Sequence, residues 1–419
     1  MREMKDSGIE WVGKVPATWK IMPNKYIMTK KKVIKEVYDD ENIISLSMNG
    51  VIVRDLEAGG KMPKTFDGYQ LVYPGNLLMC LFDYDVTPRC IGLIKDYGVT
   101  SPAYSQFVMN NGNYSGYYYY YYLMVDHTKA LLHLAKNLRH SFTEEQLGAI
   151  LAPVPTIEEQ QQIADYLDTQ CSEIDATAED IQKEISLLED YKKSLVYNVI
   201  SNGINHSIYS TENDEVWGNL PQGWKLVDIK YLFEIVKRIA GKEGYDVLSV
   251  TQKGLKIKDI TSGDGQLADN YCGYQFVYPT DYVMNHMDLL TGWVDCSELF
   301  GVTSPDYRVF RLIDRSAHNL VYYKYVMQCC YMNKIFYSLG QGVSNLGRWR
   351  LQTSSFNNFK IPVPPKDEQD EIADYLDTKC SEIDAIIADK KRQRGILAEY
   401  KKSLIYEYVT GKKEVPINE

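Results

Sequence analysis

One stretch of this chain occurs twice, and it constrains the possible fold more than any other feature. Residues 163–176 read IADYLDTQCSEIDA, and residues 372–385 read IADYLDTKCSEIDA. Apolar residues then recur every seven positions, a pattern typical of a helix that pairs with another helix along one seam. Because the chain holds two such segments, the sequence predicts that they pair with each other. The predicted seam consists of Leu167, Ile174, Ile181, Leu188 and Leu195 from the first segment, with Leu376, Ile383, Lys390, Leu397 and Leu404 from the second.

The residues that flank these segments predict two single long helices. Thr156 and Glu159 fit a capping box at the start of the first helix, and Gly203 suits its end. Gly411 is expected to end the second helix in the same way. Lys390 stands on the seam where the first copy has Ile181. A lysine there can bury its stem and keep its ammonium group in water.

The larger blocks beside the helices are also duplicated. GYQLVYP at 68–74 returns as GYQFVYP at 273–279, and GVTSPAY at 98–104 returns as GVTSPDY at 301–307. A β-hairpin is predicted around Asn49-Gly50, because Asn-Gly is a strong turn signal, and again around Lys253-Gly254. The expected fold class is therefore α/β (α+β). It comprises two similar mixed domains joined by two long antiparallel helices, which form an intramolecular coiled coil with pseudo-twofold symmetry.

Composition and charge narrow the possible classes of function. The chain of 419 residues has a net charge of −10, but residues 151–200 alone hold 11 acidic against 3 basic residues. The acidity therefore lies mainly on the helices, and it does not exclude contact of the other blocks with a phosphate backbone. Scattered cysteines, the absence of a signal peptide and the absence of a long apolar run favour a soluble cytoplasmic protein.

No motif specific to catalysis is present in the sequence. Phosphate loops, dinucleotide-binding fingerprints, zinc-ligand spacings and nucleophile elbows are all missing. We therefore expect a non-catalytic chain with no metal and no cofactor of its own. Two similar domains on an antiparallel helix pair would suit a ligand with two separated half-sites, and duplex DNA is the commonest such ligand.

The repeated helices resemble those of a known family. The resemblance rests on Pro-x-Pro, then Glu159-Gln160 or Glu368-Gln369, then Ile-Ala-x-x-Leu-Asp, with Tyr-Lys-x-Ser-Leu about 30 residues further on. This pattern is similar to the conserved helices of type I restriction–modification specificity subunits, and the GVTSP segments resemble motifs of their target recognition domains. The resemblance implies target recognition domains at 1–152 and 206–361, a central conserved helix at 153–205 and a C-terminal one at 362–419.

The same resemblance implies a function and a set of partners. Each target recognition domain would read one half of a bipartite asymmetric site in double-stranded DNA. The paired helices would set the spacer between the two halves and dock two modification (methyltransferase) subunits. Those subunits would carry S-adenosylmethionine and methylate adenine, and restriction/translocase subunits with ATP and Mg would join them. A stand-alone DNA-binding or scaffolding protein remains an alternative, as does an enzyme with an unrecognised active site.

The candidates for DNA contact are a short basic run at 30–32 and basic residues near the hairpins and before the helices, because cations on loops suit groove and phosphate contacts. They are Lys30, Lys31, Lys32, Arg54, Lys61, Lys64, Arg139, Lys253, Lys256, Lys258, Arg348 and Arg350. Arg139 and Arg348 align between the blocks, which suits either a shared phosphate contact or an internal salt bridge. The tyrosine run at 117–122 could stack on bases, but its partial repetition in the second block favours a structural helix.

Overall fold

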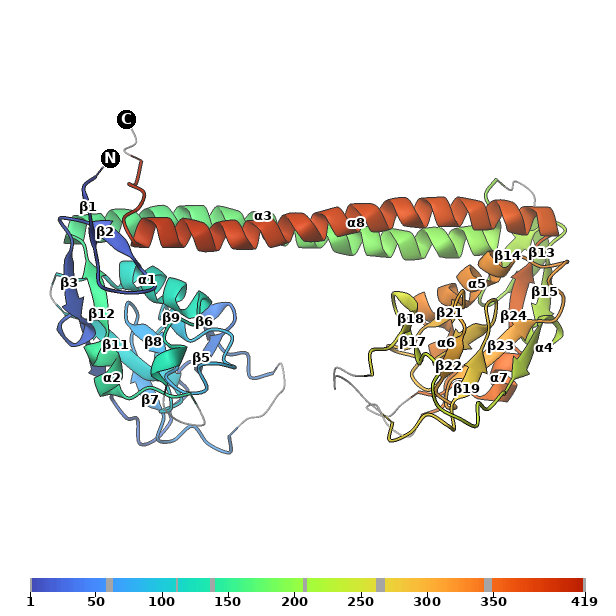
Figure 1. The fold of residues 1–419 in the computed structure, drawn as a ribbon, viewed down its shortest axis with the longest axis horizontal. Helices are drawn as coiled ribbons and strands as arrows, with labels where there is room; N and C mark the ends of the chain where they lie inside the picture. Colours follow the sequence, from blue (N-terminus) through green and yellow to red (C-terminus); the bar gives the residue numbers. More distant parts are fainter. Residues whose placement is uncertain are drawn as a thin grey trace. The chain divides into compact units, whose positions relative to one another are not determined.

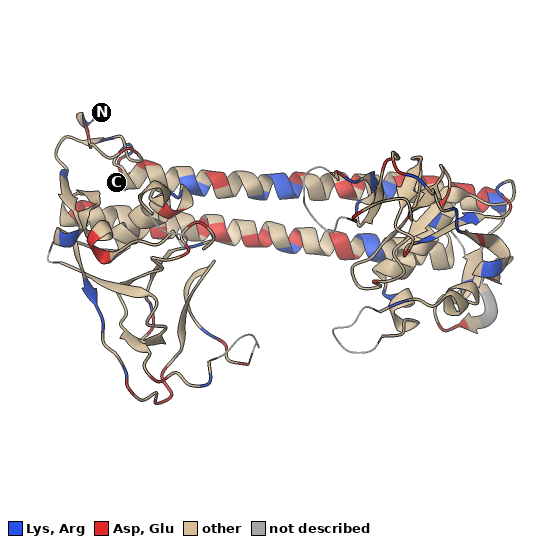
Figure 2. Ribbon diagram, turned by 60° about the horizontal axis from the view of Figure 1, so that its bottom comes forward, with Lys and Arg blue, Asp and Glu red and all other residues tan. Residues whose placement is uncertain are grey.

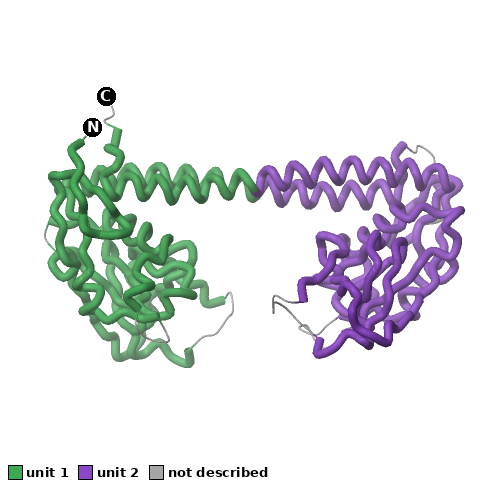
Figure 3. The backbone as a smooth tube through the Cα atoms, in the orientation of Figure 1, with its two compact units in different colours: residues 1–182, 392–419 green, residues 183–391 purple. Residues whose placement is uncertain are grey.

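The computed structural model describes residues 2–57, 63–110, 112–135, 140–205, 209–260, 268–342 and 349–416. The chain forms two compact units, shown in different colours in Figure 3. Unit 1 comprises residues 1–182 and 392–419, and unit 2 comprises residues 183–391. Each unit contains a mixed α/β domain and a part of two long helices, α3 (Ile157–Asn202) and α8 (Lys366–Val409) (Figure 1).

The domain of unit 1 is built on a four-stranded antiparallel sheet with the strand order β4-β11-β8-β9. These strands are β4 (Met28–Lys31), β8 (Leu77–Met79), β9 (Ile91–Leu93) and β11 (Ser105–Met109). The other strands form antiparallel pairs: β1 (Met4–Asp6) with β2 (Lys14–Pro16), β3 (Lys20–Pro23) with β12 (Leu151–Val154), β5 (Ile44–Ser47) with β6 (Gly50–Val53), and β7 (Gln70–Val72) with β10 (Gly98–Thr100). Helical segments are η1 (Asn24–Tyr26), α1 (Ser115–His127), η2 (Leu132–Leu134) and α2 (Glu144–Ala149).

The domain of unit 2 repeats this arrangement, with the strand order β16-β23-β20-β21 in its sheet. These strands are β16 (Phe233–Val236), β20 (Tyr282–Met284), β21 (Val294–Cys296) and β23 (Arg308–Leu312). The pairs are β13 (Tyr209–Asp214) with β14 (Gly218–Pro221), β15 (Lys225–Asp228) with β24 (Lys360–Val363), β17 (Leu248–Thr251) with β18 (Gly254–Ile257), and β19 (Gln275–Val277) with β22 (Gly301–Thr303). Its short helices are α4 (Ile229–Leu232), α5 (Leu320–Met332), α6 (Ile335–Ser338) and α7 (Thr353–Asn357).

The repeated GYQ and GVTSP motifs form one structural device in both domains. The Gln70 side chain donates from Nε2 to the carbonyl oxygens of Ser101 and Tyr104, at 2.9 and 2.7 Å. Gln275 donates in the same way to Ser304 and Tyr307, at 2.9 and 2.8 Å. Both glutamines are buried. The amide therefore fixes the turn that follows β10 and β22, and the motifs are repeated because they hold the domain together.

The tyrosine run forms the core of its domain rather than an exposed surface. Five of the six tyrosines on α1 are buried, and Tyr119 is half-buried. Tyr120 donates from its hydroxyl group to Asp168 on α3 at 2.7 Å, and Tyr325 on α5 donates to Asp377 on α8 at the same distance. Each short helix is therefore fastened to a long helix by an equivalent hydrogen bond. The structural helix favoured for the tyrosine run is present as α1, which ends at His127.

The long helices lie antiparallel to each other within each unit. In unit 1, Asp175 on α3 pairs with Lys401 on α8, with the carboxylate and ammonium atoms 2.6 Å apart. In unit 2, Lys192 on α3 pairs with Asp384 on α8, also at 2.6 Å. These two ion pairs occupy the same positions of the repeat and use the same residue types. They are solvent-exposed and contribute little stability, but they fix the alignment of the two helices.

The seam is wider than the one row of residues that the sequence analysis identified. All ten predicted positions are buried or half-buried. Four further apolar side chains, Cys171, Ile185, Cys380 and Ile387, are buried between them and complete the alternating spacing of three and four residues. Lys390 is half-buried, and its ammonium group lies 2.5 Å from the Glu184 carboxylate. This position therefore combines a packed stem with an ion pair at the surface.

The ends of the long helices follow the sequence signals, except that the Glu159 carboxylate binds a tryptophan of the domain. Gly203 and Gly411 have φ angles of 70° and 69°; Gly203 directly follows α3, and Gly411 follows α8 after Thr410. At the start of α3, the backbone N–H of Glu159 donates to the Thr156 hydroxyl at 3.3 Å. The Glu159 carboxylate accepts from the indole N–H of Trp19 at 3.1 Å, so it links the helix to the domain. Trp224 and Glu368 repeat this contact at 2.8 Å.

Across the described residues, no helix is both long enough and apolar enough to cross a membrane.

Candidate nucleic-acid interface

The two hairpins form as predicted and carry several of the candidate residues. Strands β5 and β6 are paired from Ile44↔Val53 to Ser47↔Gly50, and β17 and β18 from Leu248↔Ile257 to Thr251↔Gly254. Gly50 begins β6 and Gly254 begins β18, and both have a φ angle near 100°. Residues that carry a side chain rarely adopt this conformation. Each hairpin therefore ends in a tight two-residue turn with a fixed register.

A charged side chain from another part of the domain holds each hairpin, and it is basic in unit 1 and acidic in unit 2. In unit 1, Arg89 donates from Nη1 to the carbonyl oxygen of Met48 at 3.1 Å and from Nη2 to the Tyr119 hydroxyl on α1. In unit 2, the Asp295 carboxylate accepts from the backbone N–H of Leu255 at 2.8 Å. Two chemically different anchors thus hold the same hairpin geometry. Neither anchor was among the sequence candidates, because each lies about 40 positions from its hairpin in the sequence.

One pair of candidate cations occupies equivalent positions in the two domains. The backbone N–H of Arg54 donates to the carbonyl oxygen of Ile43, and that of Lys258 donates to Val247, both at 2.7 Å. Both residues directly follow the second strand of their hairpin and are half-buried. A cation therefore stands at the same place in both domains although the sequences around it differ.

The other candidates have more varied surroundings. Lys30 forms an ion pair with Glu144, and the Lys31 ammonium lies 3.7 Å from the centroid of the Tyr73 ring. The remaining described candidates are exposed: Lys32, Lys64, Lys253, Lys256 and Arg350. Lys61, Arg139 and Arg348 lie outside the described residues. The structure brings Lys253, Lys256 and Lys258 together on one hairpin, whereas Lys30 and Lys31 lie on the edge strand β4.

The long helices carry both acidic and basic residues along their length, and α3 is predominantly acidic (Figure 2). Two of the acidic residues on α3 have partners within unit 1: Asp168 accepts a hydrogen bond from Tyr120, and Asp175 forms an exposed ion pair with Lys401. In unit 1 a cleft of about 660 Å³ lies between the hairpin turn, α1 and the two long helices. The basic side chains at this cleft are Arg89, Lys95, Arg394, Lys401 and Lys402.

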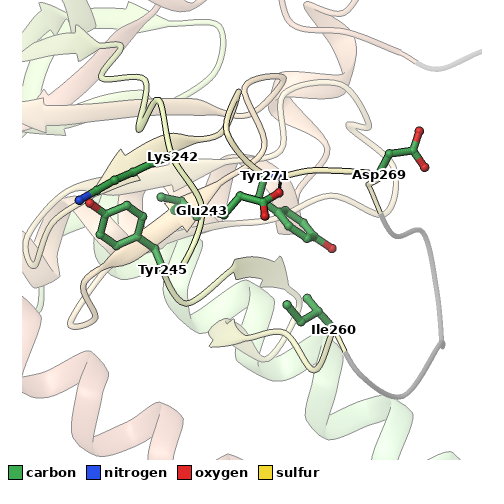
Figure 4. Close-up of a pocket in the computed structure, with 8 residues that line it drawn as sticks. Lys242, Glu243, Tyr245, Ile260, Asp269 and Tyr271 are labelled. Atoms are coloured by element: carbon green, nitrogen blue, oxygen red, sulfur yellow. Dashed lines mark hydrogen bonds between the residues drawn. The ribbon is translucent and has the colours of Figure 1, made fainter.

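Two smaller clefts lie among the described residues of the domain of unit 2. One of about 270 Å³ is shown in Figure 4, where the side chains of Lys242, Glu243, Tyr245 and Tyr271 lie along its wall. Glu243 is held by the backbone N–H of Tyr271, which donates to it at 3.1 Å. The second cleft, of about 380 Å³, lies between β17, Lys258 and the turn after β22. Only the second cleft contains one of the candidate DNA-contacting residues.

Comparison with known proteins places these features in context. Residues 221–393 match the family described as "Type I restriction modification DNA specificity domain". Over 287 residues the chain is 25% identical to the type I restriction enzyme MjaVIII specificity subunit of Methanocaldococcus jannaschii. That match covers 64% of this chain and 63% of the relative, so it spans slightly less than two thirds of the relative's length.

A solved structure shares the fold over nearly the whole chain. It is a chain from work on complex assembly and conformational transition of the type I R-M system, and it matches with a TM-score of 0.68 at 13% identity. The alignment covers 96% of this chain and 100% of the other. The predicted resemblance to type I specificity subunits is confirmed. The predicted fold class, two similar mixed domains joined by two long helices, is confirmed as well.

Proposed function

We propose that this chain, which carries a type I restriction–modification DNA specificity domain, reads a bipartite DNA site for a modification and restriction complex. Each α/β domain binds one half of the site. The chain supplies no catalytic group of its own. Methyltransferase subunits with S-adenosylmethionine carry out the modification, and restriction subunits join them with ATP and Mg.

The internal duplication of the matched domain is the observation that carries this proposal. The family match covers residues of unit 2, and unit 1 repeats its strand order and the glutamine-bound turn. A chain with two copies of a DNA specificity domain can contact two half-sites. Because the loops of the copies differ in sequence, the half-sites can differ too.

The equivalent cations support the placement of DNA beside the hairpins. Arg54 and Lys258 keep a positive charge at one position of both domains. A contact that is the same for two different base sequences suits a phosphate group, because phosphates carry no direct sequence information. The exposed Lys253 and Lys256 on the same hairpin of unit 2 add charge that would strengthen this contact.

The long helices are proposed to set the spacer and to dock the methyltransferase subunits. Both helices pass from one unit into the other without interruption. Their outer faces carry exposed charges, and the cleft of unit 1 beside them is lined by five basic side chains and by the carboxylates of Asp168 and Asp175. A surface with charges of both signs suits binding of a partner protein.

Exchange of one domain tests the proposal. Residues 1–152 would be replaced by the corresponding domain of another specificity subunit, and the methylated bases of the host genome would be sequenced in the presence of the partner subunits. We expect one half of the methylated motif to change while the other half and the spacer stay as they were. A change in both halves, or in neither, would contradict the assignment of one domain to one half-site.

A further inference from the structure

The residues that line the second cleft of unit 2 have counterparts in unit 1 that can be compared position by position. The turn residues held by the two glutamines are equivalent, so Ser101 corresponds to Ser304 and Tyr104 to Tyr307. Within this turn, the backbone N–H of Ala103 donates to the Ser101 hydroxyl at 3.3 Å. The backbone N–H of Asp306 makes the same contact with Ser304 at 3.2 Å. Asp306 therefore stands where unit 1 has Ala103.

On the opposite wall of the cleft, unit 2 again has a polar residue where unit 1 has an apolar one. Cys80 and Asn285 each follow the central strand of their sheet, and their N–H groups donate to Cys90 and Trp293 at 2.9 and 3.0 Å. Asn285 is thus the polar counterpart of a buried cysteine.

Two positions further along the same wall, Phe82 in unit 1 corresponds to Met287 in unit 2. The Phe82 ring stacks on Tyr104 with 6.1 Å between the ring centroids and an angle of 17°. In unit 2 the corresponding tyrosine, Tyr307, lies with Met287 along the wall of the open cleft of about 380 Å³.

The lining residues that are the same in both domains differ in chemistry from those that change between the domains. Three kinds of lining residue are common to both domains. In unit 2 they are the serine of the hairpin, Ser249, the cation after the hairpin, Lys258, and the serine and tyrosine of the glutamine-bound turn, Ser304 and Tyr307. The positions that differ line the same space and exchange apolar groups for an amide and a carboxylate. Asp306 is exposed, and among the described residues its carboxylate has no hydrogen-bond partner. Asp288, by contrast, accepts from the backbone N–H groups of Leu290 and Thr291 within its own turn.

We propose that this cleft reads the edge of one base pair in the half-site bound by unit 2, with Asp306 accepting a hydrogen bond from an exocyclic amino group. The amino groups exposed in the major groove are N4 of cytosine and N6 of adenine, and a carboxylate can only accept. Asn285 lines the same cleft and can bond a neighbouring acceptor through its amide N–H. In unit 1, Ala103 and the stacked Phe82 offer only apolar contact at these places, which suits a thymine methyl group. This inference rests on the proposed function and assigns the residues that give it specificity.

The test uses the full chain with its partner subunits and the methylated motif as the readout. Asp306→Ala is expected to reduce the preference for one base pair in the half-site of unit 2 by about 10-fold or more, as expected for loss of one base contact. The half-site of unit 1 should be unchanged. Ala103→Asp is expected to change one position in the half-site of unit 1 alone.

Two matched variants separate a reading role from other effects. Glu298→Ala removes an exposed carboxylate of the same unit outside the cleft and should leave the motif unchanged. Lys258→Ala should weaken DNA binding at every sequence without altering the motif, because a phosphate contact does not distinguish bases. An intact, methylating complex whose motif is unchanged by Asp306→Ala would overturn this inference. The domain exchange described above tests the proposed function separately, so the two failures are distinguishable.

Discussion

His286 lies in unit 2 next to a buried guanidinium group. The carbonyl oxygen of His286 accepts from the N–H of Leu351 at 2.9 Å, and the carbonyl oxygen of Leu351 accepts from Arg308 at 3.1 Å. Burial, together with the positive charges of Arg308 and Arg350, lowers the pKa of His286 from 6.5 to about 4. Burial also lowers the pKa of the Arg308 guanidinium to about 10. This region therefore favours a neutral imidazole.

The lowered pKa of His286 predicts an acid-sensitive unit 2. The unfolded chain binds the His286 proton more readily than the folded chain does, so the free energy of unfolding falls as the pH drops from about 6.5 to about 4. We expect the loss from this group to be about 1–3 kcal/mol. Denaturant unfolding at several pH values would measure it. His286→Leu should flatten the dependence in this window, and an equally steep dependence in that variant would show that other groups cause it.

The repeated glutamines illustrate which residue roles the sequence could reveal. GYQ and GVTSP were recognised as repeated, but the bond from each amide to two carbonyl oxygens requires residues about 30 positions apart to meet. Asp306 was not identified as a candidate, because a carboxylate in an acidic chain carries no signal until its cleft is known. The basic candidates were chosen by charge and by position in the sequence. The structure distinguishes Arg54 and Lys258 from the rest by their equivalent backbone contacts.

At the scale of elements, the long helices were the most predictable part of the chain. Heptad spacing and the glycines at their ends predict both the pairing and the limits of α3 and α8. The second row of seam residues was not recognised, because in each helix it combines one isoleucine with one cysteine, which is not a conspicuous apolar signal. The short strands were harder to delimit. Strands of three to six residues, such as β7 and β13, carry too few alternations for their ends to be read from the sequence.

Truncation of a seam residue tests the packing of the helices. Leu376 is fully buried, so Leu376→Ala should reduce the free energy of unfolding by about 2–4 kcal/mol through the lost contacts and the cavity left behind. Leu187 on α3 is 69% exposed, and Leu187→Ala should change it by less than about 0.5 kcal/mol. Denaturant unfolding followed by circular dichroism at 222 nm would compare them. Equal effects of the two substitutions would contradict the packing described for this seam.

At the scale of the whole molecule, the two long helices are the only elements that belong to both units among the described residues. If they set the spacer of the DNA site, their length determines it. Insertion of seven residues into both helices preserves the heptad phase and adds about 10 Å of helix. We expect the spacer of the methylated motif to grow by about three base pairs, at about 3.4 Å each, while both half-sites stay the same. Genome-wide sequencing of methylated bases would measure the spacer. An unchanged spacer in an active complex would show that the helices do not set it.

The division of the chain has a consequence for the order in which the protein is made. Unit 2 is one continuous stretch, whereas unit 1 needs its last residues: Leu404, Ile405, Tyr408 and Val409 lie in the core of unit 1. The Tyr117 hydroxyl also donates to the carbonyl oxygen of Val409 at 2.8 Å. On the ribosome, the half that emerges first must therefore wait with an incomplete interior. The half that emerges second can finish before it, and the core of the earlier half is completed once residues 404–409 have emerged.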